Sequence, residues 1–273
     1  MDQDNNSVGS LIRQWRQRRR LTQLDLAVDA EISQRHLSFL ESGRSQPSRE
    51  VLMQLTDRLA VPLRDRNVIL NAAGYAAHFP QHPLAAPALQ AAREAIEQIL
   101  HGHLPHPALA VDRHWTLISA NAAATALMSG VAPHLLEENP NVLRLSLHPQ
   151  GLAPRILNLE EWRSHVLARL GHEIERSADP KLSTLMDELS AYPFPTSGRH
   201  RRSTPKQHQD IAVPLRIKSD AGPLSFLSTT TVFGTAVDVT LSEVTIEAFF
   251  PMDAETARAM MNLHSRGAGY ERR

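Results

Sequence analysis

The chain has 273 residues, no cysteine, and 29 basic residues that balance 29 acidic ones. The neutral balance argues against a protein that coats nucleic acid by charge alone, and the missing cysteines exclude disulfides, thiolate zinc sites and cysteine nucleophiles. No apolar run reaches the roughly 20 residues that span a membrane, and the start lacks a signal-peptide pattern, so we expect a cytoplasmic protein.

The length favours two domains, the first of which has the pattern of five short helices within residues 1–75. Thr22, Ser33 and Ser48 are residue types that cap helix N-termini. Gly43 allows the left-handed backbone that ends the third helix. The predicted helices are Val8 to Arg20, Leu21 to Ala27, Gln34 to Leu40, Arg49 to Ala60 and Pro62 to Ala73.

Arginines cluster in the first predicted helix and just after it. Such a cluster is expected where a small part of a chain contacts phosphates, although a solvated helix face gives the same pattern. The members are Arg13, Arg16, Arg18, Arg19 and Arg20.

The third predicted helix presents two different faces. Leu37 and Leu40 lie on one side at 100° per residue. Gln and Arg at the exposed N-terminal end of a short second helix are the residue types that bond adenine and guanine edges in the major groove. We therefore predict a DNA-recognition helix rather than a polar surface helix. Its exposed side carries Gln34, Arg35, Ser38 and Phe39.

This region closely resembles the XRE family of phage-repressor helix-turn-helix proteins. The resemblance is carried by Leu21-Thr22-Gln23-x-x-Leu26-Ala27, by Ile32-Ser33-x-x-x-Leu37-Ser38-x-Leu40-Glu41-Ser42-Gly43-Arg44, and by Pro47-Ser48. It implies an all-α DNA-binding domain whose partner is a double-stranded operator.

The XRE resemblance also implies a role for each position. Gln34 and Arg35 would read bases, and Gln23 would contact a phosphate or an outer base. Ser38 and Arg44 would hold the DNA backbone. Phe39 departs from the polar residue common at its position, and contact with a thymine methyl or packing on the sugar backbone is expected there. The predicted DNA-binding residues are Gln23, Ser33, Gln34, Arg35, Ser38, Phe39 and Arg44.

Residues 76–87 are rich in proline and histidine, which predicts an extended linker between the domains. A helix is expected from Ala88 to Leu100, and His101, His103 and His106 follow it.

These three histidines do not have the pattern of a metal site. Glycine and proline break any helical alignment of the imidazoles, and no nearby carboxylate or thiolate completes a ligand set. We therefore predict no metal site and no required cofactor.

Residues 88–265 have the pattern of an α+β domain, followed by a short tail, 266–273. Two short strands precede several helices, and three strands close the domain. This order describes a five-stranded antiparallel sheet with helices on one face, as in PAS-type sensor domains. The predicted strands cover residues 108–111, 115–120, 211–217, 224–233 and 244–250.

The chain resembles the MmyB-like regulators over nearly its whole length. The motifs are Ser33 to Gly43, Val111-Asp112-Arg113-His114-Trp115, Asn121, Asn141-Val142-Leu143-Arg144, Trp162 and Ser228 to Thr235. The resemblance implies a repressor or activator with a PAS-like domain that binds a fatty acid. It does not cover Thr196 to Gln209, whose basic segment 198–208 is predicted to be a mobile surface loop, with phosphate contact as the alternative.

The implied ligand is a long apolar acid between the sheet and the helices. Arg144 is the preferred partner for its carboxylate, with a structural ion pair as the alternative role. Asn121 and His148 are candidate donors. The aromatic residues are more often core than ligand contacts. The candidate walls are Trp115, Trp162, Phe226 and Phe233.

The patterns together predict a DNA-binding transcription regulator whose operator binding is modulated by an apolar ligand. One recognition helix reads too few base pairs to find a genomic site, so we expect a homodimer with half-sites about 34 Å apart, or a multiple of that. The alternative is a C-terminal domain that serves dimerisation or protein interaction without a ligand. An enzyme is disfavoured, because we find no nucleophile elbow, phosphate loop or catalytic carboxylate pair.

Overall fold

The computed structural model describes residues 7–193 and 213–270, with side chains up to residue 265. The described chain divides into two compact units. Unit 1 runs through Ala88 and also includes Glu175–Ser177 and Gly234–Ser242; unit 2 contains the remainder. The residues of the predicted linker therefore cluster with unit 1, as does a later segment that the sequence did not assign to it.

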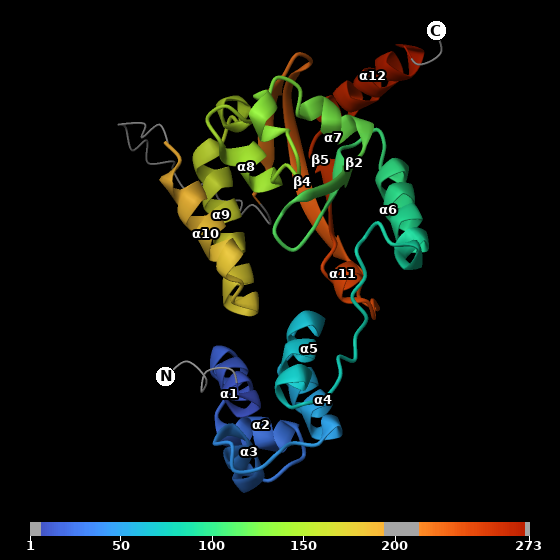
Figure 1. Cartoon of the computed structure of the whole chain (residues 1–273). Helices are drawn as coiled ribbons and strands as arrows, with labels where there is room; N and C mark the ends of the chain where they lie inside the picture. The colour runs from blue at the N-terminus through green and yellow to red at the C-terminus, as the bar shows by residue number, and fades with distance from the viewer. Residues whose placement is uncertain (1–6, 194–212, 271–273) are drawn as a thin grey trace. The chain divides into compact units, whose positions relative to one another are not determined.

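The N-terminal part of unit 1 is a bundle of five short helices, coloured blue to cyan in Figure 1. The predicted caps are confirmed: the hydroxyls of Thr22, Ser33 and Ser48 each accept a backbone N–H three residues on. Asp25 completes a capping box with Thr22. The helices are α1 Val8–Arg18, α2 Gln23–Asp29, α3 Gln34–Glu41, α4 Arg49–Arg58 and α5 Leu63–Ala72.

One close approach sets the packing of α1 on α3. A Cβ atom on Gly9 would lie 2.2 Å from the carbonyl oxygen of Leu40 and 2.9 Å from that of Glu41. Only glycine therefore fits at this position, and the backbone of α1 lies directly against the C-terminal end of α3. Around this contact the apolar stripes of the helices close one core, which includes Ile12, Trp15, Leu26, Leu37, Leu52, Leu55 and Ile69.

Side chains hold residues 78–82 within unit 1. The amide of Asn67 donates to Phe79 O at 2.8 Å and accepts from the backbone N–H groups of residues 78 and 79. Asp238 accepts from His82 N at 3.2 Å, and its Oδ2 lies 2.8 Å from His82 Nδ1. Asp238 also caps the short helix α11, Val239–Ser242. The segment predicted to be extended is thus anchored by hydrogen bonds at residues 78 and 79, near its start, and at residue 82, in its middle.

Unit 2 is built on a five-stranded antiparallel sheet, as the sequence predicted, and the strands lie in the order β2-β1-β5-β4-β3. β2 begins later than predicted because Trp115 has a φ of +66°, which interrupts an extended strand. Of the predicted strand 211–217, residues 211 and 212 lie outside the described residues. The strands are β1 Ala108–Val111, β2 Leu117–Ala120, β3 Leu215–Ser219, β4 Gly222–Val232 and β5 Thr245–Pro251.

Helices pack on both faces of this sheet, so the expectation of one covered face was wrong (Figure 1). Leu109 and Val111 face the core under α9 and α10, whereas Ala108 and Ala110 face α6. β1 is buried on both faces, so a second apolar layer has to cover it. The helices are α6 Gln90–Gly102, α7 Ala122–Leu127, α8 Val142–Leu147, α9 Leu159–Ser177, α10 Pro180–Ala191 and α12 Ala254–Tyr270.

None of the helices within residues 7–193 and 213–270 combines the length and the apolar character that crossing a membrane requires.

Candidate DNA-binding and ligand-binding sites

The exposed face of α3 carries the predicted base-reading side chains. Gln34 and Arg35 are exposed in its first turn, while Leu37 on the opposite side is fully buried. The Ser33 hydroxyl accepts the N–H of His36 at 3.1 Å and so fixes the start of the helix beside these two side chains. The local structure therefore presents one amide and one guanidinium at a capped helix N-terminus, the arrangement that can read base edges in a major groove.

Phe39 lies between two of the predicted DNA contacts. The guanidinium carbon of Arg35 is 5.3 Å from the centre of its ring, and that of Arg44 is 6.0 Å away. Both arginines are within the distance at which an aromatic face attracts a cation. The ring thus supports both guanidinium groups, a role that the sequence did not suggest, since these contacts depend on how the chain turns after α3.

Gln23 is held by a buried carboxylate. Its amide nitrogen donates to Glu41 Oε2 at 2.9 Å, and Glu41 also accepts two hydrogen bonds from Arg16, at 2.6 and 2.9 Å. Arg16 donates in addition to the carbonyl of Leu21 at 2.8 Å. The hydrogen bond and charge of Glu41 raise the pKa of Arg16 against the opposing effect of burial. This cluster joins α1, α2 and α3, and nothing in the spacing of its members predicted it.

The arginines in α1 and just after it divide into two groups. Arg19 donates to the carbonyls of Leu59 and Ala60 at 2.8 and 3.1 Å, so this arginine, like Arg16, serves the fold. A phosphate role for Arg16 was a wrong interpretation, because its guanidinium is paired with Glu41 inside unit 1. The partners of Arg19 are neutral carbonyls, so phosphate contact stays a prediction for this residue. Phosphate contact stays a prediction for the exposed members of the cluster, which are Arg13, Arg18 and Arg20.

The predicted ligand-binding aromatics lie on two sides of the sheet. Trp115, Trp162 and Phe226 are buried in the core beneath α9, with 6%, 7% and 0% of their surface exposed. Phe233 packs instead against the small cluster under α6, which includes Ile96. The structure therefore does not bring the four rings together around one space.

Asn121 has its whole amide engaged within the protein. Its oxygen accepts from the backbone N–H groups of Ala108 and Ala124, at 3.1 and 2.9 Å. Its nitrogen donates to the carbonyls of Leu100 and His106, at 3.0 and 2.8 Å. Two donors and two acceptors exhaust what an amide side chain offers, so Asn121 joins α6, β1 and α7 and caps the last of these.

Arg144 forms an ion pair, the alternative that the sequence left open. Its guanidinium donates to both oxygens of Glu188 at 2.7 to 3.0 Å, and the Tyr192 hydroxyl donates to the same carboxylate at 2.5 Å. These hydrogen bonds lower the pKa of Glu188, and burial together with Glu188 raises that of Tyr192. The ring of His148 packs against Tyr192 at 5.0 Å. A ligand carboxylate would have to displace Glu188 to reach Arg144.

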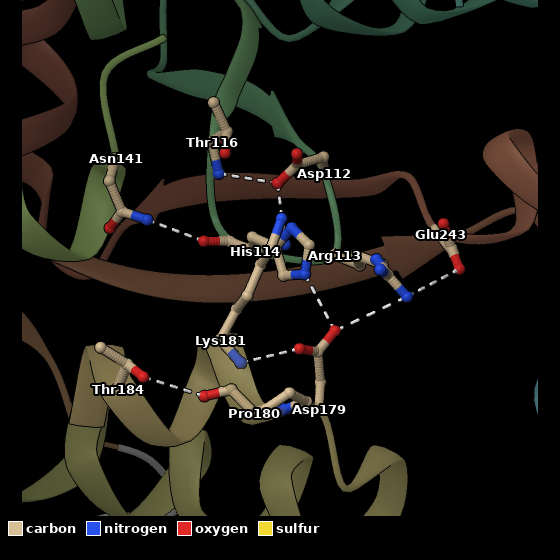
Figure 2. Close-up of polar contacts among 10 residues, drawn as sticks. All are labelled: Asp112, Arg113, His114, Thr116, Asn141, Asp179, Pro180, Lys181, Thr184 and Glu243. Atoms are coloured by element: carbon tan, nitrogen blue, oxygen red, sulfur yellow. Dashed lines mark hydrogen bonds and ion pairs between the residues drawn. The ribbon is translucent and has the colours of Figure 1, made fainter. Parts of the chain in front are cut away.

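The turn between β1 and β2 is fixed by polar contacts, drawn in Figure 2. Asp112 Oδ1 accepts the backbone N–H groups of His114 and Thr116, both at 2.8 Å. Asn141 donates to the carbonyl of His114 at 2.7 Å, and its oxygen caps α8. The motif residues around Trp115 therefore set the geometry of a turn.

Asp179 connects the same turn to the start of α10 (Figure 2). Its Oδ2 lies 2.9 Å from His114 Nε2 and 3.6 Å from Arg113 Nη1, and its Oδ1 accepts the N–H of Lys181 at 2.9 Å. Burial raises the pKa of Asp179, but these hydrogen bonds and charges outweigh burial and lower the pKa overall. Arg113 also lies 3.7 Å from Glu243, at the start of the segment before β5.

Unit 2 also contains a groove of about 1010 Å³ that sequence reasoning missed. It lies between α6, α7, α12 and the turn between β3 and β4. Among the predicted ligand residues Asn121 lines it, and the others do not. Its walls come from five segments far apart in the sequence, one of which contains Pro154 and Arg155, so no local motif could have revealed it.

Comparisons with known proteins match both units. Residues 92–263 match the family described as the MmyB-like transcription regulator ligand binding domain, and residues 12–65 match a helix-turn-helix family. The Multiprotein-bridging factor 1 proteins of Candida albicans and Debaryomyces hansenii are each 37% identical over 62 residues, 23% of this chain. The matched segment spans 41% of the length of each of these relatives.

Among solved structures, the clp gene regulator ClgR from Corynebacterium glutamicum is 29% identical, with a TM-score of 0.23. The match covers 37% of this chain and 95% of that one.

Proposed function

The chain belongs to the MmyB-like transcription regulators, and we propose that it binds a two-fold operator as a homodimer under the control of an apolar acid. DNA binding is the part that the helix-turn-helix family supports directly. The observation that carries the mode of binding is the exposed first turn of α3, where Gln34 and Arg35 stand at a capped helix N-terminus. In this reading Arg44, supported with Arg35 on the Phe39 ring, contacts a phosphate.

Substitutions of the two arginines that contact Phe39 are expected to change DNA binding in different ways. Arg35→Ala should weaken binding to the selected operator by about 10- to 100-fold and relax preference at one base pair, because a bidentate base contact is lost. Arg44→Ala should weaken all sequences about equally and reduce the salt slope by about one. Fluorescence anisotropy on an operator selected from random DNA, at several salt concentrations, measures both.

Arg58→Ala is the matched control for this experiment. Arg58 is an exposed arginine at the end of α4 and is not a predicted DNA contact, so its removal should leave both affinities nearly unchanged. Equal losses on the operator and on random DNA for both Arg35→Ala and Arg44→Ala would contradict the division of roles.

The homodimer is inferred from the size of the surface that reads DNA, since the eight residues of α3 cover too few base pairs to specify one site in a genome.

The ligand is inferred from the family, whose matched region is a ligand-binding domain. Each methylene moved out of water contributes about 0.8 kcal/mol, so an acid of a dozen carbons can remain bound through purification. A ligand changes the affinity for the operator only as far as its own affinity differs between the conformation that binds the operator and the conformation that does not.

Native mass spectrometry of the purified protein should find two chains and close to one apolar acid per chain. A monomer at the concentration that saturates the operator would contradict the dimer. A solvent extract without stoichiometric lipid, together with an unchanged melting temperature on addition of medium- and long-chain fatty acids, would contradict the proposal that the C-terminal domain binds an apolar acid. The C-terminal domain would then serve dimerisation alone.

A further inference from the structure

The groove of unit 2 has the size and lining of a small-molecule site. Its volume of about 1010 Å³ is at the upper end of the range of about 300–1,000 Å³ that such sites span. In Figure 1, α12 leaves the sheet beside α7. Residues of these two helices, of α6 and of the β3–β4 turn line the groove. Apolar side chains from three helices and the loop after α6 line it, including Leu100, Leu104, Ala123, Leu127, Met260 and Leu263.

Arg155 places a fixed positive charge at the wall of this groove. Its Nη1 donates to the carbonyls of Leu127 and Ser129 at 2.9 and 2.8 Å, and its Nε donates to that of Lys218 at 3.2 Å. All three partners are neutral carbonyl oxygens, and Arg155 forms no ion pair with any residue that the structure describes. Unlike Arg144, whose charge Glu188 neutralises, Arg155 is oriented but keeps its charge uncompensated.

The other charged groups of the groove do not cancel this charge. Lys218 adds a second cation beside Arg155. Lys218 and the acidic side chains that line the groove, Glu97 and Asp220, are all exposed, so water screens these three charges far more than it screens the half-buried guanidinium. A groove with apolar side chains along α7 and α12 and one oriented, unpaired guanidinium is complementary to a molecule with an apolar chain and a single anionic head group.

We propose that this groove binds the ligand of unit 2, an amphiphile whose carboxylate pairs with Arg155 and whose apolar chain lies along α7 and α12. This inference rests on the proposed function, and it moves the ligand from the core around Trp162 to the groove that α6, α7 and α12 line. It also replaces Arg144 by Arg155 as the partner of the carboxylate.

The head-group contact is tested by calorimetric titration of the full-length, delipidated protein with dodecanoate and with dodecan-1-ol. Arg155→Met should weaken dodecanoate binding by about 10-fold or more, because a charged hydrogen bond is lost, and should change dodecan-1-ol binding little. Arg216→Met is the matched control, an exposed arginine of β3 outside the groove, and should bind both probes as the unaltered protein does.

Arg144→Met separates the two assignments. If dodecanoate binds the unaltered protein and Arg144→Met loses this binding while Arg155→Met keeps it, the groove is excluded and the regulatory ligand stands. If neither dodecanoate nor hexadecanoate binds the unaltered protein, both the proposed acid ligand and its site in the groove are contradicted. The proposal that the protein binds DNA is not affected by this result.

A second pair of variants covers the case in which Arg155→Met fails to fold, since Arg155 holds three carbonyls. Ala126 is exposed on α7 and lines the groove, whereas Thr125 is exposed beside it and does not. Ala126→Trp should fill the groove and abolish dodecanoate binding, and Thr125→Trp should leave it within about twofold. Unchanged binding in a folded Ala126→Trp protein would overturn the proposal.

Discussion

Replacing Glu41 with alanine is expected to destabilise unit 1 by about 3 to 5 kcal/mol, the cost of breaking a buried ion pair from one side. Only 3% of the Glu41 side chain and 11% of the Arg16 side chain are exposed. The substitution leaves the guanidinium of Arg16 without its counter-charge and removes the acceptor of the Gln23 amide. Because these residues join α1, α2 and α3, the loss should loosen the helices that present the recognition face.

Hydrogen exchange of the full-length protein measures this effect where it occurs. Peptides covering α1 to α3 should exchange faster in Glu41→Ala, while peptides from the sheet of unit 2 should not change. Glu50→Ala is the matched control, because Glu50 is exposed in the first turn of α4. Protection of α1 to α3 in Glu41→Ala equal to that in Glu50→Ala would show that the buried pair contributes nothing to stability.

Glu247→Ala should destabilise unit 2 by about 3 kcal/mol. Glu247 is 4% exposed on β5, and Arg169 of α9 donates to both of its oxygens, at 2.5 and 3.0 Å. Removing the carboxylate leaves a largely buried cation packed on the Trp115 ring at 4.6 Å. We take the lower end of the range for buried pairs, because 27% of the Arg169 side chain stays exposed and Glu173 lies 3.7 Å from it.

The double variant Arg169→Met with Glu247→Met distinguishes a broken pair from a damaged core. Replacing both charges by apolar groups of similar size is often neutral, so the double variant should regain most of the stability that Glu247→Ala loses. Urea unfolding followed by tryptophan fluorescence supplies the comparison, since Trp115 lies against the pair. A double variant as unstable as Glu247→Ala would show that the pair itself is not the source of the loss.

The recognition helix could be predicted almost completely from the sequence. A cap such as Ser33 acts on a backbone N–H three residues away, and the burial of Leu37 follows from a period of 3.6 residues. The five strands of unit 2 could be predicted for a similar reason, because alternation along a strand is local, whereas their order in the sheet came only from the structure. One face of that sheet was misassigned, since α6 carries no local signal of the side on which it packs.

The buried pairs were beyond sequence reasoning. Arg16 and Glu41 are 25 residues apart, and Arg169 and Glu247 are 78 apart, so neither periodicity nor capping relates them. The assignment of Arg144 shows the same limit: the motif identifies a conspicuous cation, but only the packing of α8 against α10 brings Glu188 to it.

The sequence alone determined the helix-turn-helix domain, the α+β class of the second domain and the exposed face of α3, because capping, turn chemistry and apolar spacing act within a few residues. The tertiary structure decided which charges are neutralised and which stay available. Arg155 carries no motif in its own segment, where it follows a proline in the short 3-10 helix Ala153–Arg155. It becomes a candidate ligand contact only because α6, α7, α12 and the β3–β4 turn converge around it, and that convergence depends on the packing of the whole unit.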